Sequence, residues 1–334
     1  MEKKKINWLL ILQGWAMLWV VIGHAFIGKT GERPEYVDVL FNFAYSFHMP
    51  LFMLVSGWLF YLTRLKPANP NGGGYKWSYS EIMKDKSIRL LLPGLVFSIV
   101  ALVLKMAFPD EMSRQVGLNW QELVHSYLYP NDNPMRELWF IATLFWFFVL
   151  TPLWRIILKR KWTMWVMLAA MAVLHFVHPY TEFLCIGRVF SYAIWFYLGL
   201  LISKVDMVGR IVAKCPWWVL VLGIILYVAG HYTNAFIATI GGITGSFALA
   251  LIADKYIPRL FGSFRDYTYQ IFLMGIFAQM FIKIMYRHIT VPYFVAYILC
   301  ILMGLYVPVL VSKLIEKMNW KPLSLCVGLK TIKK

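Results

Sequence analysis

Residues 8–28 read WLLILQGWAMLWVVIGHAFIG. An apolar run of about 20 residues is the length that an α-helix needs to cross the hydrocarbon core of a bilayer. The run follows Met-Glu-Lys-Lys-Lys, as the core of a signal peptide would. However, such a core has only about 7–15 residues and is followed by an Ala-x-Ala cleavage site, which is missing here. We therefore interpret the run as a retained membrane helix.

Nine further apolar runs follow the first, and the composition agrees with them. Of the 334 residues, 60% are apolar and 15% are charged, against roughly 45–50% and about 25% in soluble domains. The ten expected spans are residues 8–28, 39–62, 90–108, 138–158, 162–177, 183–203, 217–232, 235–253, 267–285 and 292–315. We therefore expect an all-α integral membrane protein of about ten transmembrane helices. These would form one polytopic domain over residues 1–334, with no appended soluble domain.

The net charge of +17 is explained by the distribution of the basic residues. Ten spans place both termini on one side of the membrane. Of the 33 Lys and Arg residues, 25 lie in the tails and loops of that side, beginning with Lys3, Lys4 and Lys5. Basic residues concentrate on the cytoplasmic side of membrane proteins, so we expect cytoplasmic termini and no nucleic-acid partner. The four cysteines are scattered without metal-ligand spacing, and no metal site is expected.

All seven histidines fall in the outer half of the expected spans or in outer loops. His24 is 16 residues beyond Trp8, or roughly 24 Å along a helix. His48 enters the second span from the opposite direction, so the two side chains are expected at one depth, facing each other across a cavity. Ionisable groups within a span are costly unless they have a partner or a cavity, so both residues are functional candidates. For the other five we expect structural or interfacial roles.

Two stretches carry a family resemblance: Gln13 to His24, and the FHMPLFMLVSG stretch at residues 47–57. They resemble the first two motifs of the membrane acyltransferase-3 family, and most of all its fucose 4-O-acetylase type of cell-surface glycan O-acetyltransferases. Weaker matches follow in the expected order at residues 86–93, 136–140 and 267–273. Two positions depart from the family pattern. Gln13 stands where an Arg is usual, and Gly275 stands where a late His is usual.

The resemblance implies transfer of an acyl group, commonly acetyl, from cytoplasmic acyl-CoA to a hydroxyl of an extracytoplasmic or lipid-linked glycan. It implies acetyl-CoA as the donor substrate, no permanently bound cofactor, and a bacterial inner membrane as the location. A sugar hydroxyl needs a general base, and neutral imidazole suits that task. We assign His24 as the base, whereas His48 would orient the sugar, stabilise the oxyanion or relay the proton. Ser56 fits close helix packing beside Gly57 better than the role of an acyl carrier.

The remaining candidate residues bind the two substrates. CoA is polyanionic and arrives from inside, so cations at the inner face are expected to hold it. Arg188 lies inside a span, where it either snorkels outward or binds an anionic group. The donor-binding candidates are Gln13, Lys86 and Arg89, and the acceptor-binding candidates are Arg136, Glu137, Trp139 and Arg188.

Two other classes of function remain open on the sequence. One is a transporter or flippase of glycan intermediates, since ten spans around a polar cavity would serve that purpose too. The other is a membrane-embedded scaffold subunit without catalysis, suggested by Gln13 and Gly275. The sequence also leaves open the sugar, the acyl length and the oligomeric state, a homo-oligomer included.

Overall fold

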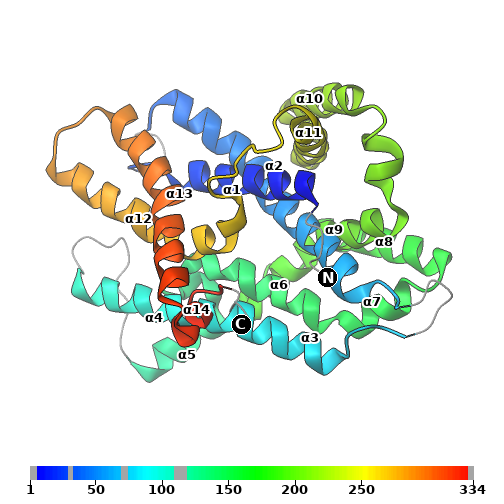
Figure 1. Ribbon diagram of the computed structural model, residues 1–334, viewed down its shortest axis with the longest axis horizontal. Helices are drawn as coiled ribbons and strands as arrows, with labels where there is room; N and C mark the ends of the chain where they lie inside the picture. The colour runs from blue at the N-terminus through cyan, green and yellow to red at the C-terminus, as the bar shows by residue number, and fades with distance from the viewer. Residues whose placement is uncertain (1–5, 29–32, 69–73, 109–118, 330–334) are drawn as a thin grey trace. The chain divides into compact units, whose positions relative to one another are not determined.

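The computed structural model describes residues 6–28, 33–68, 74–108 and 119–329, which are almost entirely helical (Figure 1). The described residues contain no strand and only one isolated bridge, between Pro67 and Tyr75. The longer helices are α1 (Asn7–His24), α2 (Glu35–Phe60), α3 (Tyr79–Lys86), α4 (Leu92–Ala107), α5 (Trp120–Leu128), α6 (Trp139–Val149), α7 (Thr151–Ile157), α8 (Lys161–Phe176), α9 (Ile186–Val205), α10 (Pro216–Thr233), α11 (Ala235–Tyr256), α12 (Thr268–His288), α13 (Tyr293–Met318) and α14 (Lys321–Cys326). Short η helices join several of them, among them η1 (Tyr61–Leu65), η2 (Ser87–Leu91), η4 (Pro130–Asp132), η5 (Arg136–Leu138) and η8 (Arg265–Tyr267).

Within this described part, eight helices are long and apolar enough to cross a membrane. The bent pair α6 and α7 makes nine if it is one span, and α8, with 16 residues, is a shorter apolar helix. The chain is therefore an all-α integral membrane protein. A count of ten spans and cytoplasmic termini remain predictions from the sequence. The basic tail from Lys3 to Lys5 lies outside the described residues.

The run at residues 138–158, expected as one straight span, is two helices bent by 53°. The break lies at Leu150, two residues before Pro152. Proline lacks the N–H that would bond the carbonyl four residues earlier, at Phe148. The Thr151 hydroxyl donates to that carbonyl oxygen at 2.5 Å instead. Short-range hydroxyl donors of this kind are how membrane helices tolerate a proline.

The helices group into two compact units. Unit 1 contains the described parts of Met1–Val55 and Val205–Met318, with α1, most of α2, and α10 to α13. Unit 2 contains Ser56–Lys204 and the described part of Asn319–Lys334, with the end of α2, α3 to α9, and α14.

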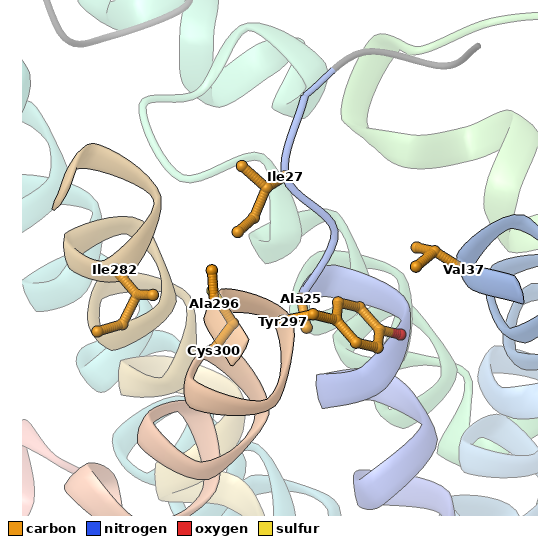
Figure 2. Close-up of a cluster of buried hydrophobic side chains, with 7 residues drawn as sticks. All are labelled: Ala25, Ile27, Val37, Ile282, Ala296, Tyr297 and Cys300. Carbon is orange, nitrogen blue, oxygen red and sulfur yellow. The ribbon is translucent and has the colours of Figure 1, made fainter. Parts of the chain in front are cut away.

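In unit 1, α1 packs against α11, α12 and α13. Figure 2 shows the cluster at the end of α1, where Ala25 and Ile27 lie with Val37 of α2, Ile282 of α12, and Ala296, Tyr297 and Cys300 of α13. The backbone there is also held by side chains. Gln279 Nε2 donates to Val21 O at 2.9 Å, and the Tyr297 hydroxyl donates to Ile22 O at 3.3 Å. The C-terminal end of α1, which carries His24, is therefore fixed by both apolar and polar contacts.

Glycines bring α10 and α11 of unit 1 together. A Cβ on Gly241 would lie 2.2 Å from the Tyr227 nitrogen, and one on Gly223 would lie 2.5 Å from the Gly245 nitrogen. Small residues permit such close backbone contact between membrane helices. The outward face of α10 is exposed and apolar, with Trp218, Ile224 and others, as a lipid-facing surface requires.

Unit 2 has an aromatic core. Trp154 is fully buried and donates from Nε1 to Phe147 O at 2.7 Å, while the Phe147 and Phe196 rings stack at 4.7 Å. A Cβ on Gly57 would lie 2.0 Å from the Phe196 carbonyl oxygen. The end of α2 and α9 therefore pack backbone to backbone at Gly57, beside Ser56.

Candidate active site

His24 and His48 both contact one tyrosine in unit 1. The Tyr45 hydroxyl lies 3.5 Å from His24 Nε2, and the two rings are tilted with centroids 5.9 Å apart. The Tyr45 ring also meets His48 edge to face, with centroids 4.9 Å apart. Tyr45 also stacks on Phe41 at 4.1 Å. The sequence analysis did not single out Tyr45, although its place three residues before His48 puts both on one face of α2.

The hydrogen bonds of the two histidines define which ring nitrogen is basic. His24 Nδ1 lies 2.8 Å from Val20 O, and His48 Nδ1 lies 2.5 Å from Ala44 O. Carbonyl oxygens only accept, so in each ring Nδ1 must carry the hydrogen. The neutral ring then has its lone pair on Nε2. His48 is buried, with 1% of its surface exposed, whereas His24 is half-buried.

The proline two residues after His48 explains how α2 is anchored. Pro50 has no N–H, so the Ser46 carbonyl loses its partner within the helix. The Thr239 hydroxyl of α11 donates to Ser46 O at 2.6 Å and also lies 2.9 Å from Ala235 O. The backbone two residues before His48 is therefore tied to α11.

A lysine of α12 meets the end of α1. Lys283 Nζ donates to His24 O at 2.7 Å and lies 4.9 Å from the Phe26 ring. A cation at a helix C-terminus interacts favourably with the unpaired carbonyls there. Lys283 was missed from the sequence, because nothing in its own helix marks it as facing His24.

Gln13 lies on the same face of α1 as His24, because 11 residues make three turns, about 16 Å apart. Arg265 of η8 packs against the neighbouring residue, with its Cβ 3.1 Å from where a Cβ on Gly14 would lie. Its guanidinium donates to Pro258 O, Leu260 O and Asn7 Oδ1. Its buried Nε has no acceptor among the described residues.

The other donor-binding candidates, Lys86 and Arg89, lie in unit 2. Arg89 is 53% exposed and pairs with Asp85 at 2.9 Å, and Arg64 pairs with the second oxygen of Asp85 at 2.5 Å. Lys86 is directed inward, with Nζ 4.2 Å from the Phe148 ring centroid. Lys86 therefore packs on an aromatic ring, whereas Arg89 is exposed and paired with a carboxylate.

Beside them lies a cluster of arginines and aromatic rings that the sequence analysis did not assign. Arg64 stacks 3.8 Å over Trp77, and Arg155 stacks 4.2 Å over Tyr75 and donates to Trp77 O. The buried Trp77 Nε1 and Arg155 Nε have no acceptor among the described residues. Burial raises the pKa of the Tyr75 phenol, against the opposing effect of Arg155, so this hydroxyl remains a hydrogen-bond donor at neutral pH. Two buried donors of the cluster thus lack an acceptor, which suits the binding of an anion.

The acceptor-binding candidates gather elsewhere in unit 2. Arg188, near the start of α9, stacks 4.3 Å over the Trp139 ring and donates to Asn131 Oδ1. Its charge also interacts with that of Arg136. Arg136 and Glu137 form the η5 turn directly before Trp139. Arg188 is thus held by the Trp139 ring and by Asn131. Both residues are close in the sequence to the candidates Arg136 and Glu137.

The remaining histidines have local partners. His125 Nε2 lies 3.3 Å from Asp132, His175 Nδ1 bonds Ser191 O at 2.6 Å, and His178 Nδ1 bonds His175 O at 2.8 Å. No group of three or more His, Cys, Asp or Glu residues in the described part of the chain is arranged to hold a metal ion.

Comparison with known proteins agrees with the motifs. Residues 6–313 match the sequence model of the acyltransferase domain family Acyl_transf_3, so the chain belongs to this acyltransferase family. The match covers residues of both units. No curated protein and no solved structure matches the chain. The protein is thus a membrane-embedded acyltransferase whose family acts on hydroxyl groups.

Proposed function

We propose that the protein transfers an acyl group, by preference acetyl, from acyl-CoA to a hydroxyl of a cell-surface glycan or of its lipid-linked precursor, in a bacterial inner membrane. The proposed activity is close to that of the fucose 4-O-acetylase type of enzyme. The observation that carries it is the pair of histidines around Tyr45, in which each Nδ1–H is bonded to a carbonyl and each Nε2 holds a lone pair.

In this mechanism His24 Nε2 takes the proton of the acceptor hydroxyl as the oxygen attacks the thioester carbonyl. The new carbon–oxygen bond forms, the carbon–sulfur bond breaks, and the proton passes from His24 to the CoA thiolate. The products are the ester and free CoA. Lys283, bonded to the carbonyl of His24, positions the end of α1 during these steps. His48, in edge-to-face contact with Tyr45, orients the sugar or stabilises the oxyanion.

For the donor, we propose that the cations of unit 2 bind the phosphates of CoA. Arg89, Arg64 and Arg155 supply positive charge, and the orphaned donors Trp77 Nε1 and Arg155 Nε supply hydrogen bonds. The planar guanidinium matches phosphate geometry, which favours arginine over lysine here. Lys86 is packed on the Phe148 ring. Its positive charge attracts the phosphates without a direct contact. In unit 1, the polar side chains that we propose for CoA binding are Gln13 of α1 and Arg265 of η8. Arg265 donates to Asn7 Oδ1 at the start of α1.

For the acceptor, we propose that Trp139 and Arg188 form the binding surface, with Arg136 and Glu137 at its edge. Family membership favours this enzyme over a transporter of glycan intermediates. Purified protein in nanodiscs, given acetyl-CoA and candidate acceptors, should release free CoA only when an accepted glycan is present. Wild-type protein that is inert with all acceptors, while its vesicles still move lipid-linked saccharides, would overturn the proposal in favour of transport.

A further inference from the structure

Unit 2 contains an apolar cavity of about 180 Å³ between η2, α4, α5 and α6. Its walls include Leu91, Gly94 and Leu95 on one side and Leu138 and Ile141 on the other. Its walls are almost entirely apolar, and a volume of this size accepts a hydrocarbon about as large as benzene. It therefore suits roughly six carbons of a chain and no polar ligand.

The polar groups near the cavity are already bonded to one another. Ser98 Oγ donates to Asn133 Oδ1 at 3.0 Å, and the Tyr127 hydroxyl donates to Ser98 Oγ at 3.2 Å. The Met135 nitrogen donates to the same Asn133 oxygen at 2.9 Å. These bonds close the polar side of the cavity, so the remaining wall offers only apolar contact.

The cavity lies along α4, which belongs to a helical stretch, Tyr79–Ala107, long and apolar enough to cross a membrane. Ser98 is nine residues before the end of α4 at Ala107, or about 14 Å along the helix. The segment from α5 to η4 therefore reaches back along α4. The exposed side chains Leu91, Leu95, Ile99 and Val103 lie on one face of this region, at intervals of four residues. Leu91 and Leu95 belong both to this exposed apolar face and to the cavity wall, so a membrane hydrocarbon chain would have direct access to the cavity.

The Arg188 guanidinium adjoins the cavity through one short segment, and the Glu182 carboxylate accepts from Nδ2 of Asn131, the same asparagine to which Arg188 donates. Pro130 and Asn133 line the cavity, while Asn131 between them accepts from Arg188. Leu138 lines the cavity, and the next residue, Trp139, carries the stacked Arg188 guanidinium. Arg188 lies in the first turn of α9, where the helix dipole also favours an anion. An apolar chain and an anionic group on one molecule would thus be bound together.

We infer that this part of unit 2 binds a single-chain lipid phosphate, with the hydrocarbon chain in the cavity and the phosphate at Arg188. The inference rests on the proposed function, because it selects the lipid-linked precursor over the finished surface glycan as the acceptor. The saccharide would extend from the phosphate along Trp139.

The test is photo-crosslinking of the full-length protein in phosphatidylcholine nanodiscs. The probe is dodecyl phosphate with a diazirine near the chain end, and labelled peptides are mapped by mass spectrometry. A Cβ at position 94 would lie 3.6 Å from Leu138 and from Ile141, an ordinary contact distance. Gly94→Ala is therefore compatible with the fold and should lower labelling of α4 and α6 in part, and Gly94→Leu should lower it at least fivefold. Val103→Leu, an equally apolar enlargement outside the cavity, should label like wild type.

Unlabelled dodecyl phosphate should compete at least tenfold better than dodecanol, which has the same chain without the charge. Labelling that is unaffected by either Gly94 variant, or equal competition by dodecanol, would overturn the inference. Crosslinking needs no catalysis, so the two proposals fail separately. A wild-type protein that labels as expected but never releases CoA contradicts only the proposed function. One that releases CoA with water-soluble glycans but does not label contradicts only the lipid site.

Discussion

The bond between Thr239 and the Ser46 carbonyl gives the sharpest test of how His48 is positioned. Thr239→Val keeps the shape of the side chain but removes the hydroxyl that donates to the carbonyl left open by Pro50. A buried group that loses its partner costs about 1–3 kcal/mol. Hydrogen bonds between membrane helices average about 0.6 and reach about 1.7 kcal/mol. We therefore expect the free energy of unfolding to fall by about 1–2 kcal/mol.

The same substitution in a Pro50→Ala background separates this cause from a general packing effect. Alanine restores an N–H that reaches Ser46 O within α2. In this background Thr239→Val should lower the free energy of unfolding by less than about half as much as in wild type. The double-mutant cycle should therefore give a coupling energy near 1 kcal/mol between the two substitutions. Unfolding is measured in bicelles by steric trapping. Thr63→Val is the control, because its hydroxyl bonds only Leu59 O in its own helix. Additive effects of Pro50→Ala and Thr239→Val would refute the reasoning.

Three further changes can be measured in the same system. Gly241→Ala should destabilise the protein by about 1–3 kcal/mol, because its Cβ would lie 2.2 Å from a backbone nitrogen of α10, whereas at Gly245 the nearest atoms are 4.0 Å away and Gly245→Ala should be nearly neutral. Tyr45→Phe keeps the ring contacts and removes a long 3.5 Å hydrogen bond to His24, so stability should change by less than about 0.5 kcal/mol and acyl transfer, followed as CoA release, by less than about tenfold. Asp85→Asn leaves two arginines without their shared carboxylate, so thermal unfolding should show a loss of about 1–3 kcal/mol that shrinks as salt is added.

The helical membrane fold was predictable, because runs of about 20 apolar residues have no other stable form in lipid. The bend at Leu150 was not predicted, although Pro152 was visible in the sequence, since hydropathy alone joins the two halves into one run. The close glycine contacts of α10 and α11 also escaped the sequence analysis. A glycine in an apolar run shows nothing of the neighbour that it faces.

For the candidate site, the depth count along α1 and α2 predicted that His24 and His48 share one depth. In the structure His24 ends α1, His48 lies near the middle of α2, and both contact Tyr45. Tyr45 itself, Lys283 and Trp77 came only from the structure. An aromatic or basic residue near a membrane interface has a common role as an anchor, so its identity alone does not mark a functional contact. The roles assigned to the site residues remain predictions.

The central claim is that His24 is the general base of acyl transfer. The direct measurement is the rate of CoA release and ester formation in nanodiscs by wild type and by His24→Gln, with His231→Gln as the control on an exposed helix end. General-base catalysis contributes about 10²–10⁴ in rate. The account predicts a loss of that size for His24→Gln, with His231→Gln close to wild type. A His24→Gln protein that keeps more than about a tenth of the wild-type rate would contradict it.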